Sequence, residues 1–161
     1  MRRLLTTMAA AVVVGMMATA AEAQTVNFTA NLSGSNETPA PGVTTGAFGA
    51  ATVTWNSATQ TLSWIIDVWN MPSGTNNAHF HVGGPGVAGP TVVNIAFPAN
   101  ISNDFRLTGS ATATDLLPRD AQGVRSWQDF EQSLIGGQTY INIHSAANPG
   151  GEVRGQVIRT P

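Results

Sequence analysis

Residues 51–69 read ATVTWNSATQTLSWIIDVW, and they decide the fold class of this 161-residue chain. Small or polar side chains alternate with apolar ones over residues 51–55, and an apolar-rich run returns over residues 62–69. Alternation with a period of two is typical of a half-buried strand. Two such segments joined by a short polar turn over residues 56–60 predict a β-hairpin.

The same signals continue on both sides of this hairpin. Glycine, proline and asparagine separate most of the segments, as expected of turns, and residues 34–46 form a loop that contains two prolines. Seven or eight short strands at such spacing predict an all-β fold, an antiparallel β-sandwich or barrel. The further strands are expected at residues 26–32, 78–82, 91–97, 105–114, 139–144 and 152–158.

One segment, residues 126–135, breaks the period of two. Trp127, Phe130 and Leu134 recur at helical spacing after Ser126, and two glycines follow the segment. This pattern predicts one short helix that packs its apolar stripe across an end of the sheet and leads into the next strand.

The first 23 residues have the grammar of a secretory signal peptide. Two arginines precede an apolar segment that ends in the small residues of an A-x-A cleavage pattern. We therefore expect a signal peptide over residues 1–23 and one β domain over residues 24–161. The apolar segment is short for a bilayer span, so no membrane span is expected after its removal, and the expected location is the periplasm or the extracellular space.

The composition excludes several classes of function. The chain contains no cysteine, which excludes disulfides, thiolate zinc sites and thiol nucleophiles. Seven basic residues against nine acidic ones offer no patch for a nucleic acid. No phosphate loop, EF-hand, dinucleotide fingerprint or G-x-S-x-G elbow is present, so the sequence gives no positive indication of an enzyme.

The three histidines provide the most specific chemical signal. His79 and His81 alternate with Phe80 and Val82, whose side chains are expected in the core, so both imidazoles should lie on the opposite, more solvated face. His144 has the same parity on a later strand. If the two strands are neighbours, the three imidazoles meet and suit a copper or zinc ion, with copper ahead in the Irving–Williams order.

Other polar residues would surround such a site. They are candidates for hydrogen bonds to the ligands or for ligand binding, and they come from the strand of His144, the following strand and the first loop. An alternative stays open, in which the imidazoles are merely solvated and His144 satisfies backbone groups of the turn at residues 145–151. The surrounding candidates are Tyr140, Asn142, Glu152, Arg154 and Glu37.

Four sequence elements together resemble the CHRD domain, a family named after chordin. They occur in the family's order and span essentially all of residues 24–161. The resemblance implies an all-β module found in secreted proteins, without an established reaction in its bacterial members. The elements are GSNETP at 34–39, AHFHVG at 78–83, YINIH at 140–144 and GGEVRGQ at 150–156.

Two functional hypotheses follow. The first is an exported, non-catalytic module that binds an unknown protein partner or surface component. The second is an extracytoplasmic copper- or zinc-binding protein that uses the three histidines. The His-x-His strand also resembles the copper-ligand strand of copper/zinc superoxide dismutases, but the chain has no further histidine for a second metal and no cysteine pair, so dismutase activity is not expected.

Overall fold

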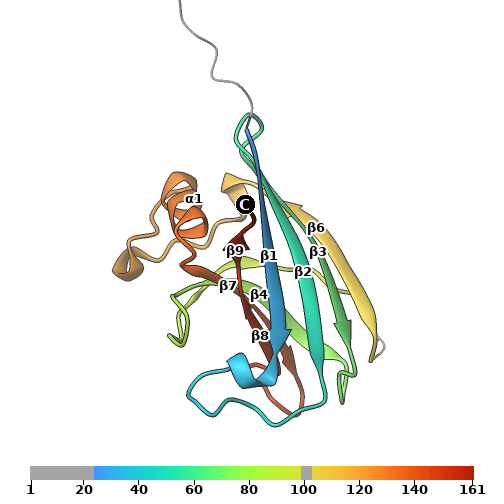
Figure 1. Ribbon diagram of the computed structural model, residues 1–161. Coiled ribbons are helices and arrows are strands. Elements are labelled where there is room, and N and C mark those ends of the chain that lie inside the picture. Colours follow the sequence, from blue (N-terminus) through green and yellow to red (C-terminus); the bar gives the residue numbers. More distant parts are fainter. Residues whose placement is uncertain (1–23, 99–102) are drawn as a thin grey trace, which may run out of the picture.

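The computed structural model describes residues 24–98 and 103–161 of the chain. The expected signal peptide, residues 1–23, lies outside the described residues. The chain folds into one antiparallel β-sheet that curves into a nearly closed barrel, with a single short α-helix in the described residues packed against one end (Figure 1). The prediction of an all-β barrel or sandwich is confirmed, in its barrel form.

The sheet follows the order β5-β4-β7-β8-β1-β2-β3-β6, and the short β9 pairs with β1. Neighbours in this order are distant in sequence at β3–β6, β4–β7 and β8–β1, and the last of these contacts places the first and last parts of the described chain side by side. The elements are β1 (Thr25–Ser33), η1 (Gly34–Asn36), β2 (Phe48–Asn56), β3 (Thr61–Trp69), β4 (Thr75–Val82), β5 (Thr91–Asn94), β6 (Phe105–Ala111), η2 (Ala113–Asp115), η3 (Asp120–Gln122), α1 (Trp127–Ile135), β7 (Thr139–Ser145), β8 (Val153–Gln156) and β9 (Ile158–Arg159).

The hairpin that the sequence predicts at residues 51–69 is β2 and β3, which pair along their whole length. Three other strands are shorter than expected. β5 ends at Asn94, and β6 ends where Thr112 begins a 3-10 turn capped by Asp115. The last strand is divided at Val157, whose N–H donates to the Thr139 carbonyl while the next two residues pair with β1.

The barrel interior holds the hydrophobic core. Alternate side chains of every long strand point inward, and the aromatic ones contact each other: Trp64 meets Phe80 edge to face, with ring centroids 5.2 Å apart. The helix α1 closes one end, since Trp127 packs against Trp55 and donates its indole N–H to the Gln60 carbonyl. The apolar stripe of the predicted helix therefore has the packing role expected of it.

Among the described residues, no helix has the length and apolar character needed to cross a bilayer.

Candidate metal centre

The pairing of β4 with β7 brings the three histidines together. Asn142 lies opposite His79, and Asn77 lies opposite His144, so the two strands run antiparallel with the histidines in adjacent positions. Phe80 and Ile143 are fully buried in the barrel core, which leaves the imidazoles on the outer face of the sheet. The predicted parity is confirmed on both strands.

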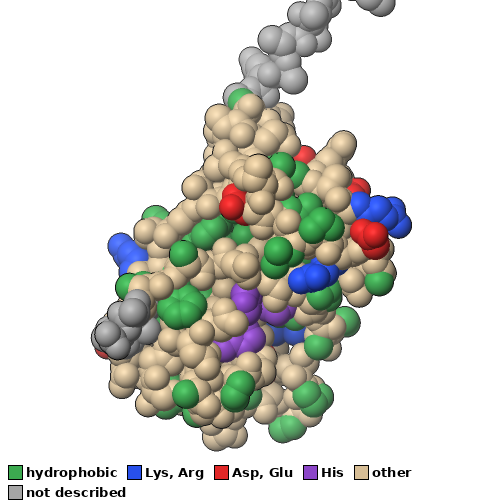
Figure 2. All heavy atoms as spheres, turned by 180° about the vertical axis from the view of Figure 1, so that it is seen from behind, with side chains coloured by type: hydrophobic (Ala, Val, Ile, Leu, Met, Phe, Trp, Pro, Cys, Tyr) green, Lys and Arg blue, Asp and Glu red, His purple; other side chains and the backbone are tan. Residues whose placement is uncertain are grey.

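The three rings converge on one small volume. The Nδ1 atom of His79 lies 3.2 Å from Nε2 of His144, and one nitrogen of each ring lies within 4.8 Å of the others. Figure 2 shows the histidines gathered in one group on the face of the molecule opposite to the view of Figure 1. Part of the group is visible from outside in this view, and His79 is its partly exposed member.

This outer face is not the solvated face that the alternation predicts. His81 and His144 are only 8% and 7% exposed, and Tyr140 and Asn142 beside them are also buried. The prediction failed because two long loops contact the outer face of β4, β7 and β8. One follows β1 and carries Glu37, and the other joins β4 to β5.

Backbone carbonyls fix the protonation pattern of two of the rings. Nδ1 of His81 lies 2.9 Å from the carbonyl oxygen of Gly89, and Nδ1 of His144 lies 2.9 Å from that of Pro149. A carbonyl only accepts, so both Nδ1 atoms carry the proton and both Nε2 atoms have a free lone pair. Metal-binding histidines are typically oriented in this way.

The two unprotonated Nε2 atoms differ in their surroundings. Nε2 of His81 is buried and has no hydrogen-bond partner among the described residues. Nε2 of His144 is near Nδ1 of His79, which donates to it in the absence of an ion. An unpartnered buried nitrogen costs free energy, and a metal ion that accepts its lone pair removes that cost.

All three imidazoles favour the neutral form. Burial lowers the pKa of His79 and of His81 to about 4, and it also lowers the pKa of His144. The Gly89 and Pro149 carbonyls act in the opposite direction on His81 and His144, and burial outweighs them. Neutral imidazole is the form that binds a metal, so at neutral pH no ring has to lose a net proton, and His79 only has to move its proton from Nδ1 to Nε2 to bind through Nδ1.

The separations fit a first-row transition metal. Two nitrogens bound to a tetrahedral ion at about 2.0–2.1 Å lie about 3.3 Å from each other. The 3.2 Å between His79 and His144 already matches this value. A shift of up to about 1.5 Å in the His81 ring brings the longest separation, at most 4.8 Å, into the same range.

Tyr140 and Arg154 support His81 from the side. The Tyr140 ring is nearly parallel to the His81 ring, with centroids 4.8 Å apart, and the Arg154 guanidinium covers the other face of Tyr140 at 3.5 Å. The Tyr140 hydroxyl accepts from the Gly89 N–H and donates to the Gly89 carbonyl, the same carbonyl that binds His81. Both residues are candidates from the sequence. Tyr140 holds the His81 ring in place and Arg154 holds Tyr140, so their role is to position a candidate metal ligand.

The remaining candidates, Asn142, Glu37 and Glu152, form hydrogen bonds to groups other than the histidines. Asn142 donates to Glu37 at 3.3 Å, and burial raises the pKa of Glu37 to about 7. Glu152 does not reach the histidines: it accepts from Ser145 and Asn148, and so holds the turn whose Pro149 carbonyl orients His144. The suggestion that His144 satisfies a backbone group of this turn is also correct, and this contact frees its other nitrogen.

Sequence reasoning missed the two carbonyls that orient the rings. Both belong to glycine- and proline-rich segments, residues 83–90 and 148–151, which the sequence indicates only as turns. A carbonyl has no side-chain signature. The role of each carbonyl depends on the position of its loop beside a histidine, Gly89 beside His81 and Pro149 beside His144.

A single β-barrel with a buried three-histidine group on its outer face defines the class of this molecule. The CHRD domain model matches residues 28–157, and the chain belongs to the CHRD domain family. The resemblance noted in the sequence is thereby confirmed. Comparison with curated proteins gave no match, and comparison with solved structures gave none.

Proposed function

We propose that this CHRD domain protein binds one copper or zinc ion through His79, His81 and His144. The observation that carries the proposal is the convergence of three neutral imidazoles, one nitrogen of each within 4.8 Å of the others. Two of the rings are held by backbone carbonyls at Nδ1, which leaves their Nε2 atoms unprotonated. Copper is ahead of zinc, because a site with nitrogen ligands follows the Irving–Williams order.

The ion would have three protein ligands and an open position. Among the described residues, no fourth histidine, cysteine or carboxylate joins the group. Three protein ligands with a free position leave room for water or another small molecule, as in catalytic rather than structural zinc sites. We further propose the periplasm or the extracellular space as the place where the protein works, on the grammar of residues 1–23.

A metal titration followed by thermal melting tests the proposal. Copper or zinc should raise the melting temperature of the wild-type protein, because a ligand that binds only the native state stabilises it. The His79→Ala and His144→Ala variants should lose this shift. Their metal affinity should fall more than about 100-fold, which exceeds the loss caused by removing a residue that only hydrogen-bonds to a metal ligand. An unchanged melting curve for both ions in the wild-type protein refutes the proposal.

Asn94→Ala provides the matched control. Asn94 is exposed and lies opposite His79 on β5, but it contributes no ligand to the group. The metal-induced shift should survive in this variant. If it is lost there as well, the shift reports a change in β4 and β5 rather than coordination.

A second candidate function is partner binding, which rests on an exposed aromatic pair. Phe48 and Trp69 stack on the outer face of β2 and β3 with centroids 5.3 Å apart, and they are 48% and 37% exposed. Exposed aromatic side chains of this kind are enriched at protein interfaces. Loss of partner capture in Trp69→Ser, with the melting temperature unchanged, would support this second function.

A further inference from the structure

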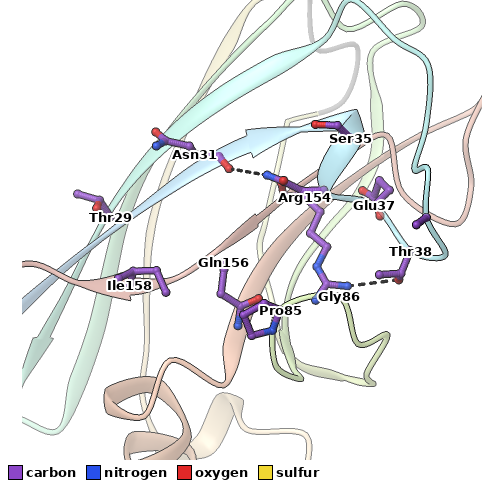
Figure 3. A pocket seen from close by; sticks show the side chains of 12 residues that line it. Thr29, Asn31, Ser35, Glu37, Thr38, Pro85, Gly86, Arg154, Gln156 and Ile158 are labelled. Atoms are coloured by element: carbon purple, nitrogen blue, oxygen red, sulfur yellow. Dashed lines mark hydrogen bonds between the residues drawn. The ribbon is translucent and has the colours of Figure 1, made fainter.

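A pocket of about 600 Å³ lies beside the histidine group on the same outer face of the barrel. Its floor consists of outward side chains of β1, β8 and β9, and its walls are the loop after β1 and the loop after β4. This volume is in the range of sites that hold small organic ligands. The lining residues are Thr29, Asn31, Ser35, Asn36, Glu37, Thr38, Ala40, Pro85, Gly86, Arg154, Gln156 and Ile158 (Figure 3).

Arg154 closes one end of the pocket and separates it from the histidines. Its side chain is only 2% exposed, and it extends from β8 toward Thr38 (Figure 3). Its Nη2 atom donates to the Gly84 and Val87 carbonyls of the loop after β4, and its Nη1 atom donates to Thr38 of the loop after β1. The guanidinium therefore connects both wall loops. Nε–H and one Nη1 hydrogen donate to no atom of the described residues, which leaves two of its five donors for a ligand.

Acceptors in the lining also lack partners. Oε1 of Gln156 is buried and has no hydrogen-bond partner in the described part of the chain, while its Nε2 is held by two backbone carbonyls. Oε1 of Glu37 is buried and unpartnered in the same way. Buried acceptors without partners cost free energy, and a ligand that donates to them removes the cost.

The lining as a whole has mixed hydrogen-bonding capacity and balanced charge. Arg154 and Glu37 carry opposite charges when both are ionised, and the other lining residues are uncharged. Thr29 and Asn31 are exposed, and their side chains hydrogen-bond to no described residue. Pro85 and Ile158 add apolar surface. Hydroxyl groups both donate and accept, so a neutral ligand rich in hydroxyls matches this lining better than an ion does.

We infer that this pocket is a binding site for a neutral saccharide, which would pack an apolar C–H face against Pro85 and Ile158 and direct hydroxyls to Asn31, Gln156 and Arg154. The site is separate from the histidine group and does not require a metal. Saccharide binding is therefore expected in protein treated with a chelator.

Amide NMR spectra of the full chain, titrated with cellotriose, maltotriose and triacetylchitotriose in the presence of EDTA, test the inference. At least one trisaccharide should shift the amide signals of Ser35, Gly86, Arg154 and Ile158, while signals on the far β6 strand stay in place. If none of the three shifts these signals, the inference is wrong. If only trigalacturonate or only a tripeptide shifts them, the pocket takes another class of ligand and the saccharide assignment falls.

Three variants locate the binding. Asn31→Ala removes an exposed side chain that holds no part of the fold, and it should weaken binding at least tenfold. Thr29→Trp should abolish binding by filling the pocket. Thr108→Trp, the same change at an exposed position of β6 outside the pocket, should leave the affinity unchanged. Equal binding by wild type and Thr29→Trp would place the saccharide elsewhere and overturn the assignment.

Discussion

The ring of Tyr140 lies against the ring of His81 at an angle of 10°, with centroids 4.8 Å apart. Both residues bind the Gly89 carbonyl, His81 through Nδ1 and Tyr140 through its hydroxyl. One carbonyl therefore fixes the protonation of a candidate metal ligand and the position of the ring stacked on it. The β4–β5 loop becomes part of the candidate metal centre without contributing a ligand.

Tyr140→Phe should lower the free energy of unfolding by about 1–3 kcal/mol, because the Gly89 N–H loses its acceptor while the stacked ring stays. Tyr140→Leu should lower it by about 0.5–1.5 kcal/mol more, since the stacking on His81 is lost as well. Urea denaturation of the three proteins measures both steps. Equal stability of wild type and Tyr140→Phe would mean that the hydroxyl contributes nothing to holding the loop.

Gly89→Ala should destabilise the protein by about 1–3 kcal/mol or more, as overpacked sites do. A Cβ atom at Gly89 would overlap the Val82 carbonyl oxygen, so the loop would have to move away from β4 and take its carbonyl from His81. Gly46→Ala is the control, because a Cβ there meets no atom within 4 Å. Thermal melting of both variants should show a large loss only for Gly89→Ala.

Pleat parity is a strong constraint, so the sequence predicts a shared orientation of the three histidines, but their convergence only on the condition that the two strands are neighbours. Phe80 and Ile143 both require the core, and this alone places His79, His81 and His144 on the other face. Solvent exposure could not be predicted in the same way. It depends on where the loops of residues 34–47 and 83–90 lie, and their glycines and prolines indicate turns but no direction.

The choice between sandwich and barrel was also beyond the sequence. It depends on which strands are neighbours, and the decisive contacts, β4 with β7 and β8 with β1, join segments about 60 and 120 residues apart. Alternation within a strand carries no information about such partners. The break at Val157, where the chain passes from β8 to β9, has the same origin, because β9 pairs only with β1.

Glu37→Gln should change how stability depends on pH. Burial raises the pKa of Glu37 from 4.5 to about 7. At pH values between these two pKa values, the Glu37 carboxyl group holds a proton in the folded protein that it has lost in the unfolded chain. Stability of the wild type, relative to the variant, should therefore fall as pH rises from about 4.5 to 7, by at most about 3 kcal/mol in total.

Denaturation of both proteins at several pH values measures this difference. Arg154 and Glu152 are the charged groups that act on Glu37, and both are present in wild type and variant, so the comparison isolates the carboxyl group. The histidines contribute equally to both proteins. If the difference in free energy of unfolding between the two proteins is constant with pH, or grows in favour of the wild type as pH rises, the raised pKa of Glu37 is contradicted.

Arg154→Lys should destabilise both loops that cover the outer face, although it conserves the charge. The guanidinium binds Thr38 in one loop, binds the Gly84 and Val87 carbonyls in the other, and stacks on Tyr140. A lysine ammonium has three donors and no planar face, so it cannot make the same set of contacts.

Hydrogen exchange should therefore become faster at the Val87 and Gly89 amides, which are bonded to Gly84 and to Tyr140. The same substitution at Arg106 is the control. Arg106 is exposed and pairs with Asp67 at 2.7 Å, and such a surface pair contributes less than about 1 kcal/mol. Arg106→Lys should leave exchange in the β4–β5 loop unchanged, and equal protection in both variants would show that Arg154 does not tie the loops together.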